Sequence, residues 1–455
     1  MYRKQDIKFL QDIYDRDSND IAVLYGRAEN GLAHITADFI KDKECLYYKA
    51  CAVNDVTQRQ LFAQELFEQT KTPYLPNDDY GDLIRSFINS NPGKKKLVVL
   101  EDFQYILKEN PTCINYLANL LTEKTKSGSA MFLLISDNVR WVETDMVKMI
   151  GRKSSEISGV IKLNDYSPAE IYEQFPKMPL SELIGIYSVL GGRSVYYDTI
   201  TDESVLKSVV IEKLESFMYI DHSANPFLWR DIREPSLYNT ILVNLAKGRG
   251  KLNDLHGITG VDRAKLAVYL KTLVEYGLVE KIISAQVGNA NTQKGTYRIC
   301  PGLASFYYRF VFPHASSLIT NGPERFYRRH IEHELYSYID EMYMFFCMEH
   351  IKWLRDNGRL NFKVASVEEY HDRDGAVDFV IVAAGGSVIA CSCSYSANHM
   401  NSAVYENVKA AVKKNRINCD NIWLFSAGGF DQKLTMLESV SVGLKLIEGK
   451  DQRLR

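Results

Sequence analysis

The sequence lacks long apolar runs, clustered cysteines and an excess of charge of either sign. Because no stretch of about 18 residues is continuously apolar, no transmembrane helix is expected. The N-terminal MYRKQDIKFL also lacks the apolar segment of a secretion signal. The formal net charge of −2 means that any contact with nucleic acid requires a local basic surface. We therefore expect a soluble, cytoplasmic protein without a membrane partner.

The 8 cysteines are scattered along the chain. Only Cys391 and Cys393 lie close together, and a C-x-C pair without a second pair is a poor zinc signature. Dispersed free thiols suit a reducing compartment. The sequence therefore predicts neither a disulfide framework nor a metal site.

At 455 residues the chain is too long for one core, and its first third predicts a parallel, doubly wound sheet. Short apolar runs alternate there with helical segments of roughly ten to fifteen residues. The expected strands are Ile21–Tyr25, Cys45–Tyr48, Leu97–Leu100 and Met131–Ile135, and the expected helices are residues 2–15, a segment ending near Ile40, and Thr57–Gln69. Ligands of such sheets bind at the carboxyl ends of the strands, where Gly26, Glu101 and Ser136 are expected.

The turn after the first expected strand reads YGRAENGLA, from Tyr25 to Ala33. Its two glycines have the spacing of the phosphate-binding pattern G-x-x-x-x-G-K-[ST], in which backbone N–H groups cradle phosphate, the Lys reaches the β/γ oxygens and the hydroxyl holds Mg²⁺. Here Leu32 replaces the Lys and Ala33 replaces the Ser or Thr. The candidate nucleotide-binding residues are Gly26, Arg27, Gly31, Leu32 and Ala33.

The remaining sequence divides into three further parts. Residues 169–235 have a helical pattern that Gly191-Gly192 interrupts. Residues 236–300 predict three helices and then two strands, which is the pattern of a winged helix-turn-helix. Residues 301–455 predict helices as far as Trp353 and then a small mixed α/β domain. The expected elements are helices Leu237–Ala246, Lys251–Thr259, Asp262–Glu275 and Ala403–Lys414, a strand entered at Gly277–Val279, and strands Thr296–Cys300, Phe362–Val367, Val377–Val382, Val388–Cys393 and Ile422–Phe425.

Five short motifs occur in an order that resembles one prokaryotic family. They are a first helix with RKQDIKFL from Arg3, the loop YGRAENGLA, an apolar strand ending in EDFQ from Glu101, the element YSVLGGRSVY from Tyr187, and the aromatic segment FYYRFV from Phe306. The chain is similar to archaeal-type P-loop ATPases of the AAA+/STAND group fused to a C-terminal nuclease-like domain of unknown function. The resemblance covers nearly the whole chain. It implies an α/β P-loop ATPase-like domain at 1–168, a helical lid at 169–235, a winged helix at 236–300, a nuclease-like domain with linker helices at 301–455, and ATP as the ligand.

Departures from the family pattern bear on ATP hydrolysis. Loss of the loop Lys removes charge-assisted phosphate contacts worth about 1.5–3 kcal/mol each, and Ala33 cannot ligate Mg²⁺. Glu29 adds a carboxylate to the loop, and His34 is either a substitute cation or a packed or solvated side chain. Glu101 and Asp102 stand in exchanged order, either as a rearranged Mg²⁺ and water-positioning pair or as vestigial acids. The residues leave ATP binding open and argue against Mg²⁺.

The resemblance also implies a PD-(D/E)XK nuclease fold in the C-terminal part. In that fold an Asp and an E-x-K pair on the next strand bind a metal and assist phosphodiester hydrolysis. Asp378 matches the Asp, but Ala390 replaces the Glu and Ser392 replaces the Lys. A single carboxylate provides neither a two-metal nor a general-base site. Asp378 is therefore expected to be vestigial, and no catalytic residue is assigned.

The winged-helix segment raises the question of DNA binding. Its third helix carries Arg263, Lys265 and Lys271, and several such contacts to phosphate would be needed for affinity. Acidic neighbours dilute this face, so the segment is either a DNA contact or a packing or protein-docking module. The second basic run includes Arg325, Arg328 and Arg329, which otherwise form a solvated helix face.

Together these features favour a pseudo-ATPase: a degenerate P-loop protein that acts as a regulatory, adaptor or nucleic-acid-associated module and is not expected to be an enzyme. The alternatives are an ATP-binding switch, held by backbone N–H groups and a helix N-terminus, and a weak ATPase of the AAA+/STAND group with a rewired site. The partner is either DNA or another protein.

Overall fold

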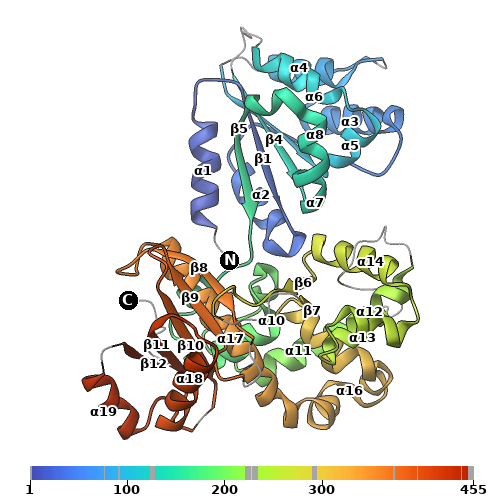
Figure 1. The fold of residues 1–455 in the computed structure, drawn as a ribbon. Helices are drawn as coiled ribbons and strands as arrows, with labels where there is room; N and C mark the ends of the chain where they lie inside the picture. The colour runs from blue at the N-terminus through green and yellow to red at the C-terminus, as the bar shows by residue number, and fades with distance from the viewer. Residues whose placement is uncertain are drawn as a thin grey trace. The chain divides into compact units, whose positions relative to one another are not determined.

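The computed structural model describes residues 3–75, 77–90, 93–122, 129–220, 227, 234–288, 295–371, 375–396, 398–441 and 443–448 (Figure 1). The chain forms two compact units. Unit 1 comprises Met1–Asp165 and Arg193–Asp198, and unit 2 comprises Tyr166–Gly192 and Thr199–Arg455. The chain therefore leaves unit 1, returns to it for one short segment and leaves it again.

Unit 1 is built on a five-stranded parallel sheet. The strands are β1 (Asp20–Gly26), β2 (Cys45–Lys49), β3 (Lys96–Glu101), β4 (Ala130–Ser136) and β5 (Ile157–Leu163), in the order β2-β3-β4-β1-β5. The predicted parallel sheet is confirmed, and β1 and β4 are buried along their whole length. The fifth strand was not predicted. It lies at the sheet edge, and Ser158, Gly159 and Lys162 interrupt its apolar residues, so that no continuous apolar run forms.

Helices cover both faces of this sheet, and Figure 1 shows α1 on one side and α3 and α5 on the other. Alternate residues of a strand point to opposite faces, so Ala22 and Leu24 pack with α1 and α2 while Ile21 and Val23 pack in the opposite core. The first core includes α1 (Lys4–Tyr14) and α2 (Leu32–Ile40). The second includes α3 (Asp55–Thr70), α4 (Tyr80–Asn89), α5 (Gln104–Glu109), α6 (Cys113–Thr122) and α8 (Val147–Ile150), and the short helix α7 (Val139–Trp141) packs against it.

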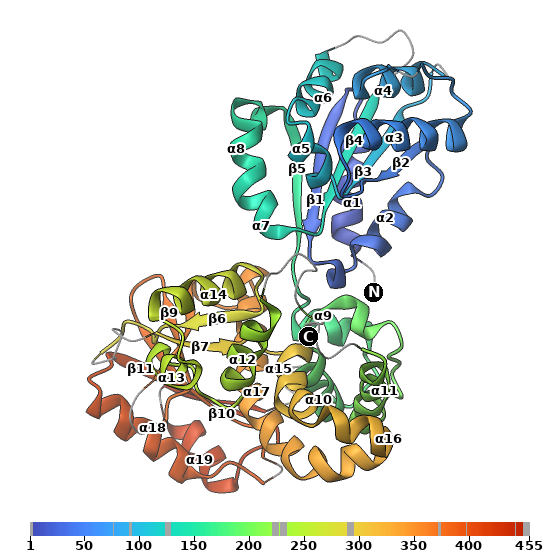
Figure 2. The same ribbon diagram turned by 90° about the vertical axis from the view of Figure 1, so that its right-hand side faces the viewer.

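Unit 2 begins with helices and a strand pair (Figure 2). The helices are α9 (Pro168–Gln174), α10 (Leu180–Leu190), α11 (Leu206–Met218), α12 (Pro235–Ala246), α13 (Leu252–Thr259) and α14 (Arg263–Glu275). Strand β6 (Val279–Ile282) pairs antiparallel with β7 (Thr296–Ile299). The three helices and two strands predicted between residues 236 and 300 are present in that order. Residues 289–294 of the loop between these strands lie outside the described residues.

The chain then passes through helices into a mixed five-stranded sheet. The helices are α15 (Leu303–Phe306), α16 (Ala315–His330), α17 (Glu332–Asp356), α18 (Ser402–Lys414) and α19 (Gln432–Val440). The strands are β8 (Val364–Glu369), β9 (Phe379–Ala383), β10 (Val388–Ser394), β11 (Cys419–Ser426) and β12 (Leu444–Glu448), in the order β12-β11-β10-β9-β8. Strands β10, β11 and β12 are parallel, whereas β9 runs antiparallel to β10 and to β8. Helices α18 and α19 share one core with the sheet and lie next to each other in Figure 2.

The fold is therefore α/β: a P-loop-like five-stranded parallel sheet, then helices, then a mixed five-stranded sheet. Strand β12 and helix α19 were not predicted. Among the described helices, none is both long enough and apolar enough to cross a membrane.

Candidate functional site

The loop after β1 has the strand–turn–helix frame expected of a phosphate loop. Gly26 ends the strand so close to β5 that a Cβ atom there would lie 2.7 Å from the carbonyl oxygen of Leu163. Residues Ala28–Asn30 form a single 3-10 turn, and α2 starts directly after Gly31. Gly31 has a φ of +87°, a conformation that favours glycine. Both glycines of the predicted pattern are therefore required by the backbone.

The backbone N–H groups of this loop are partly used within the loop itself. Asn30 N–H donates to the carbonyl of Arg27 at 2.9 Å, and Gly31 N–H donates to that of Ala28 at 3.2 Å. A phosphate cradle requires such groups to point at the ligand. Two donors of the loop, the N–H groups of Asn30 and Gly31, are thus used to close this turn.

The segment Arg193–Asp198 of unit 1 lies against the loop. The Ser194 hydroxyl donates to the carbonyl of Glu29 at 3.3 Å, and a Cβ atom on Gly31 would lie 2.7 Å from the same Oγ. The Arg193 guanidinium approaches the Glu29 carboxylate, with 3.9 Å between Nη1 and Oε1. The carboxylate that the sequence adds to the loop therefore has a basic neighbour from a distant part of the chain. No role for Arg193 was predicted, because residue spacing does not reveal this return of the chain.

The two substituted positions of the loop differ in burial. Leu32 is 6% exposed and packs in the core that contains Ile35 and Phe39, whereas Ala33 is exposed. For His34, the possible substitute cation, Nε2 lies 3.6 Å from Oδ2 of Asp198, and both side chains are about half exposed. The position of the missing Lys is thus occupied by a core side chain, and His34 faces a carboxylate.

The two acids at the end of β3, Glu101 and Asp102, pair with a lysine from the neighbouring strand. Lys49 Nζ lies 2.5 Å from Glu101 Oε1 and 3.5 Å from Asp102 Oδ2. Tyr47 donates a further hydrogen bond from its hydroxyl to Glu101. Asp102 has a φ of +54°, which is uncommon for a residue other than glycine. Both predicted acids therefore lie together at the carboxyl edge of the sheet, with Lys49 where a metal ion would compete for them.

Asp137, directly after β4, joins this group. Burial, together with the nearby charge of Asp102, raises its pKa to about 7. The link continues through Gln104, whose amide donates to Asp102 Oδ1 at 3.3 Å and whose Oε1 accepts from Ser136 Oγ at 2.8 Å. The Ser136-Asp137 pair at the end of an apolar run was the only sequence signal for this carboxyl group.

In the C-terminal sheet, Asp378 has a structural contact. Its Oδ2 accepts a hydrogen bond from the backbone N–H of Cys393 at 2.7 Å. Ala390 and Ser392 on β10, which the sequence resemblance aligned with a nuclease Glu and Lys, are both buried. Within the described residues, no group of three or more His, Cys, Asp or Glu side chains could hold a metal ion.

The three predicted cations of α14 each have a polar partner. Lys265 lies 3.3 Å from Glu234, Lys271 lies 3.8 Å from Glu275, and Arg263 donates to Asn253 at 3.0 Å. The same helix exposes Val268 and Val274. The three cations share one helix, but carboxylates lie beside two of them, so the surface there carries charges of both signs.

The second basic run lies at the C-terminal end of α16. Arg325, Arg328 and Arg329 are exposed there, and Arg328 lies 3.9 Å from Glu324.

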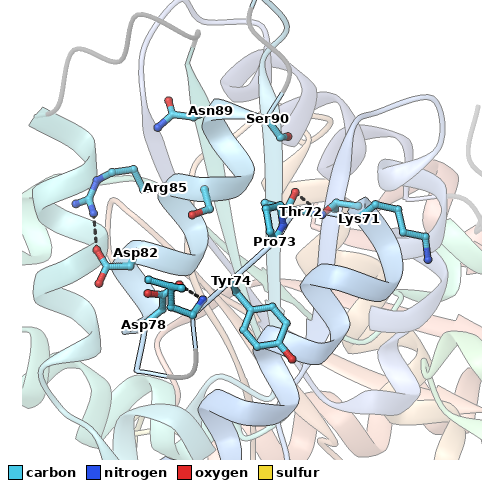
Figure 3. Close-up of a pocket in the computed structure, with 12 residues that line it drawn as sticks. Lys71, Thr72, Pro73, Tyr74, Asp78, Asp82, Arg85, Asn89 and Ser90 are labelled. Atoms are coloured by element: carbon cyan, nitrogen blue, oxygen red, sulfur yellow. Dashed lines mark hydrogen bonds and ion pairs between the residues drawn. The ribbon is translucent and has the colours of Figure 1, made fainter.

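A groove of about 960 Å³ lies between the end of α3 and helix α4, as Figure 3 shows. Its wall includes Tyr74 and Leu75, and Asp82 and Arg85 on that wall pair with each other at 2.9 Å. Helix α3 follows the carboxyl end of β2, so its own end lies toward the amino edge of the sheet. The groove is therefore not part of the loop site.

A family described as archaeal and bacterial proteins of unknown function (DUF234) matches residues 307–408, which span α16, α17, the strands β8 to β10 and the start of α18. An uncharacterised protein of Methanocaldococcus jannaschii is 22% identical over 328 residues, 70% of each chain.

Among solved structures, the chain is similar to a Walker-type ATPase of Pyrococcus abyssi, with a TM-score of 0.43, 12% identity and coverage of 68% of this chain and 95% of that one. It is also similar to the ORC2 protein of Aeropyrum pernix, with a TM-score of 0.44, 15% identity and coverage of 70% and 94%.

Proposed function

We propose that this chain is a pseudo-ATPase, a P-loop fold kept as a regulatory or adaptor module that does not hydrolyse ATP. One observation carries the proposal: the loop after β1 is closed by its own hydrogen bonds and by the Arg193–Asp198 segment. In this proposal residues 1–168 are the ATPase-like domain, 169–235 the lid, 236–300 the winged helix, and 301–455 a nuclease-like domain with linker helices and no nuclease activity.

The residues do not fit Mg-ATP. Leu32 supplies no positive charge for the developing γ-phosphoryl charge, and Ala33 supplies no oxygen for Mg²⁺. Lys49 is already paired with the acids that would have to hold the metal. Each missing charge-assisted contact is worth about 1.5–3 kcal/mol, so productive binding of the triphosphate loses at least one major contribution.

A titration of the full chain with a fluorescent ATP analogue, with and without Mg²⁺, tests the proposal. We expect a Kd above about 1 mM and phosphate release at background. The double variant Leu32→Lys with Ala33→Thr should gain less than about tenfold in affinity, because the Asn30 and Gly31 amides still bond within the loop. Leu32→Met, which conserves volume, is the matched control for repacking. Steady phosphate release that disappears in Glu101→Gln or Asp102→Asn would show a working ATPase instead.

The runner-up is an ATP-binding switch without hydrolysis, and one contact favours it. Arg193 brings a guanidinium to the loop. The 3.9 Å between its Nη1 and Oε1 of Glu29 makes this a long ion pair, and it is partly exposed. A phosphate group that displaced Glu29 would find a cation suited to bidentate contacts. Metal-independent ATP binding that Glu29→Gln strengthens and Arg193→Gln abolishes would favour the switch over the pseudo-ATPase.

For residues 236–300 we propose a packing or protein-docking module. Exposed Val268 and Val274 on α14 and the paired state of Lys265 and Lys271 support docking over DNA contact by this helix.

A further inference from the structure

Helix α18, in the C-terminal part of the chain, carries a basic surface that differs from that of α14. Residues 402–418 contain four basic side chains and one carboxylate, although the whole chain has a net charge of −2. The four, defined here as the α18 cation row, are Lys409, Lys413, Lys414 and Arg416.

The α18 cation row is exposed, and three of its members, Lys409, Lys413 and Arg416, differ from the cations of α14. Within the described residues, no ion pair joins a carboxylate to Lys409, Lys413 or Arg416. Lys409 lies over the ring of Tyr405, with 5.6 Å from Nζ to the centroid. A basic surface with an aromatic side chain is the composition that contacts nucleic-acid phosphates.

Stabilisation of the helix accounts for only part of this arrangement. Lys413 and Lys414 lie in the last turn of α18, where positive charge offsets the helix dipole. Lys409 lies one turn earlier, outside the range of that effect. Arg416 follows the helix with a φ of +51°, a position usually taken by Gly or Asn. A cation is thus present where the backbone disfavours it.

The surroundings indicate which partner this surface fits. Within the described residues, α18 exposes no large hydrophobic side chain, so it lacks an apolar anchor for a protein partner and the apolar face of a membrane-bound helix. From Lys409 to Lys414 the helix rise spans roughly 7 Å, which matches about three successive phosphates of one duplex strand. Arg416 follows just beyond the end of the helix.

The row also adjoins the turn that follows β6. A Cβ atom on Gly288 would lie 2.3 Å from the carbonyl oxygen of Asn415, and Ala285 shares a core with Val408 of α18. The cation row and the strand-pair segment therefore form one continuous part of unit 2.

We propose that the α18 cation row is a binding surface for the phosphate backbone of duplex DNA, independent of sequence. This surface is distinct from α14 and does not depend on the state of the nucleotide loop.

The test is a fluorescence anisotropy titration of the full chain with a labelled duplex of arbitrary sequence at 50–200 mM salt. The variant is Lys409→Gln, Lys413→Gln, Lys414→Gln and Arg416→Asn; Asn is chosen because it tolerates positive φ. We expect at least about a tenfold loss of affinity at low salt and a log–log salt slope flatter by up to about 3.6 units, at 0.9 per phosphate contact.

Two controls separate this result from bulk charge and from unfolding. Replacing exposed Lys4, Lys8, Lys108 and Lys148 of unit 1 by Gln removes the same charge and should leave the slope within about half a unit. Ala410→Lys adds a cation beside the row and should steepen the slope by about 0.9 units, a gain that misfolding cannot produce.

An unchanged slope in the fourfold variant, an equal loss in the unit 1 control, or no gain from Ala410→Lys would overturn the proposal. Tighter binding of single-stranded RNA of the same length, lost in the same variant, would replace duplex DNA as the occupant.

Discussion

At the scale of single residues, Asp137 is a carboxyl group that folding makes costly to ionise. Its pKa rises to about 7 in the folded chain, against an ordinary value near 3.9. Between about pH 4 and 7 the folded state holds a proton that the unfolded state releases, so this group lowers the stability as pH rises through that range.

Asp137→Asn removes that dependence. We expect the variant to be more stable than the natural chain at pH 8, by about 1–2 kcal/mol after allowance for solvent screening, and nearly equal to it at pH 4. Thermal or urea denaturation at both pH values measures the difference. A stabilisation that is larger at pH 4 than at pH 8 would contradict the burial of the charge.

Asp378 gives a second prediction at this scale. Asp378→Ala leaves the backbone N–H of Cys393 without its acceptor, which costs about 1–3 kcal/mol when the group is shielded from water. Asp378→Asn keeps an acceptor oxygen and should cost less. Denaturation of both variants measures the cost.

The same two variants test for nuclease activity. Neither should change the state of a plasmid, because the natural chain is expected not to nick DNA with any divalent metal. Metal-dependent nicking that Asp378→Ala abolishes would show that another side chain completes the site.

At the scale of elements, helix α14 shows how neighbouring carboxylates reduce the DNA binding expected from a set of basic residues. Three free phosphate contacts would contribute about 2.7 units to the salt slope of DNA binding. Because Lys265 and Lys271 face Glu234 and Glu275, replacing Arg263, Lys265 and Lys271 by Ala should change the slope by less than one third of that amount. Gel shifts or anisotropy over a salt series decide this.

A full loss of about 2.7 units would return the DNA contact to α14. If the chain binds DNA and neither this variant nor the α18 variant weakens that binding, Arg325, Arg328 and Arg329 become the expected contact.

At the scale of the whole molecule, the short return of the chain to unit 1 is the feature with the widest effect. Tyr197 on this segment is 2% exposed and belongs to unit 1, although both flanking segments belong to unit 2. Tyr197→Ala should therefore destabilise unit 1 by about 3–5 kcal/mol, the usual cost of truncating a buried aromatic side chain. Tyr197→Phe, which keeps the ring, is the control.

Hydrogen exchange of the full chain provides the measurement. We expect faster exchange in β1 and α2 in the Ala variant and unchanged exchange in β10 and β11. Equal acceleration in both units, or none in unit 1, would mean that this segment does not support the loop.

The local pattern of residues in the sequence determined the buried strands and the glycines of the loop. Apolar runs of four or five residues, such as Leu97–Leu100, are buried on both faces of a parallel sheet, and a run of that kind identifies its strand without knowledge of its neighbours. The glycines of the loop likewise follow from local backbone needs. Edge strands such as β5 and β12 lack this signal, because only part of each strand is buried.

The tertiary structure alone decided which side chains meet. Lys49 reaches Glu101 because β2 and β3 are neighbours in the sheet, and Asp102 meets Asp137 because β3 and β4 are. Arg193 meets Glu29 because the chain returns to unit 1 more than one hundred residues later. The sequence by itself showed that the loop lacks a Lys and a hydroxyl. That Arg193 contacts the loop at Glu29 depends on the return of the chain, and that Lys49 pairs with Glu101 and Asp102 depends on the order of the strands. No local spacing of residues encodes either feature.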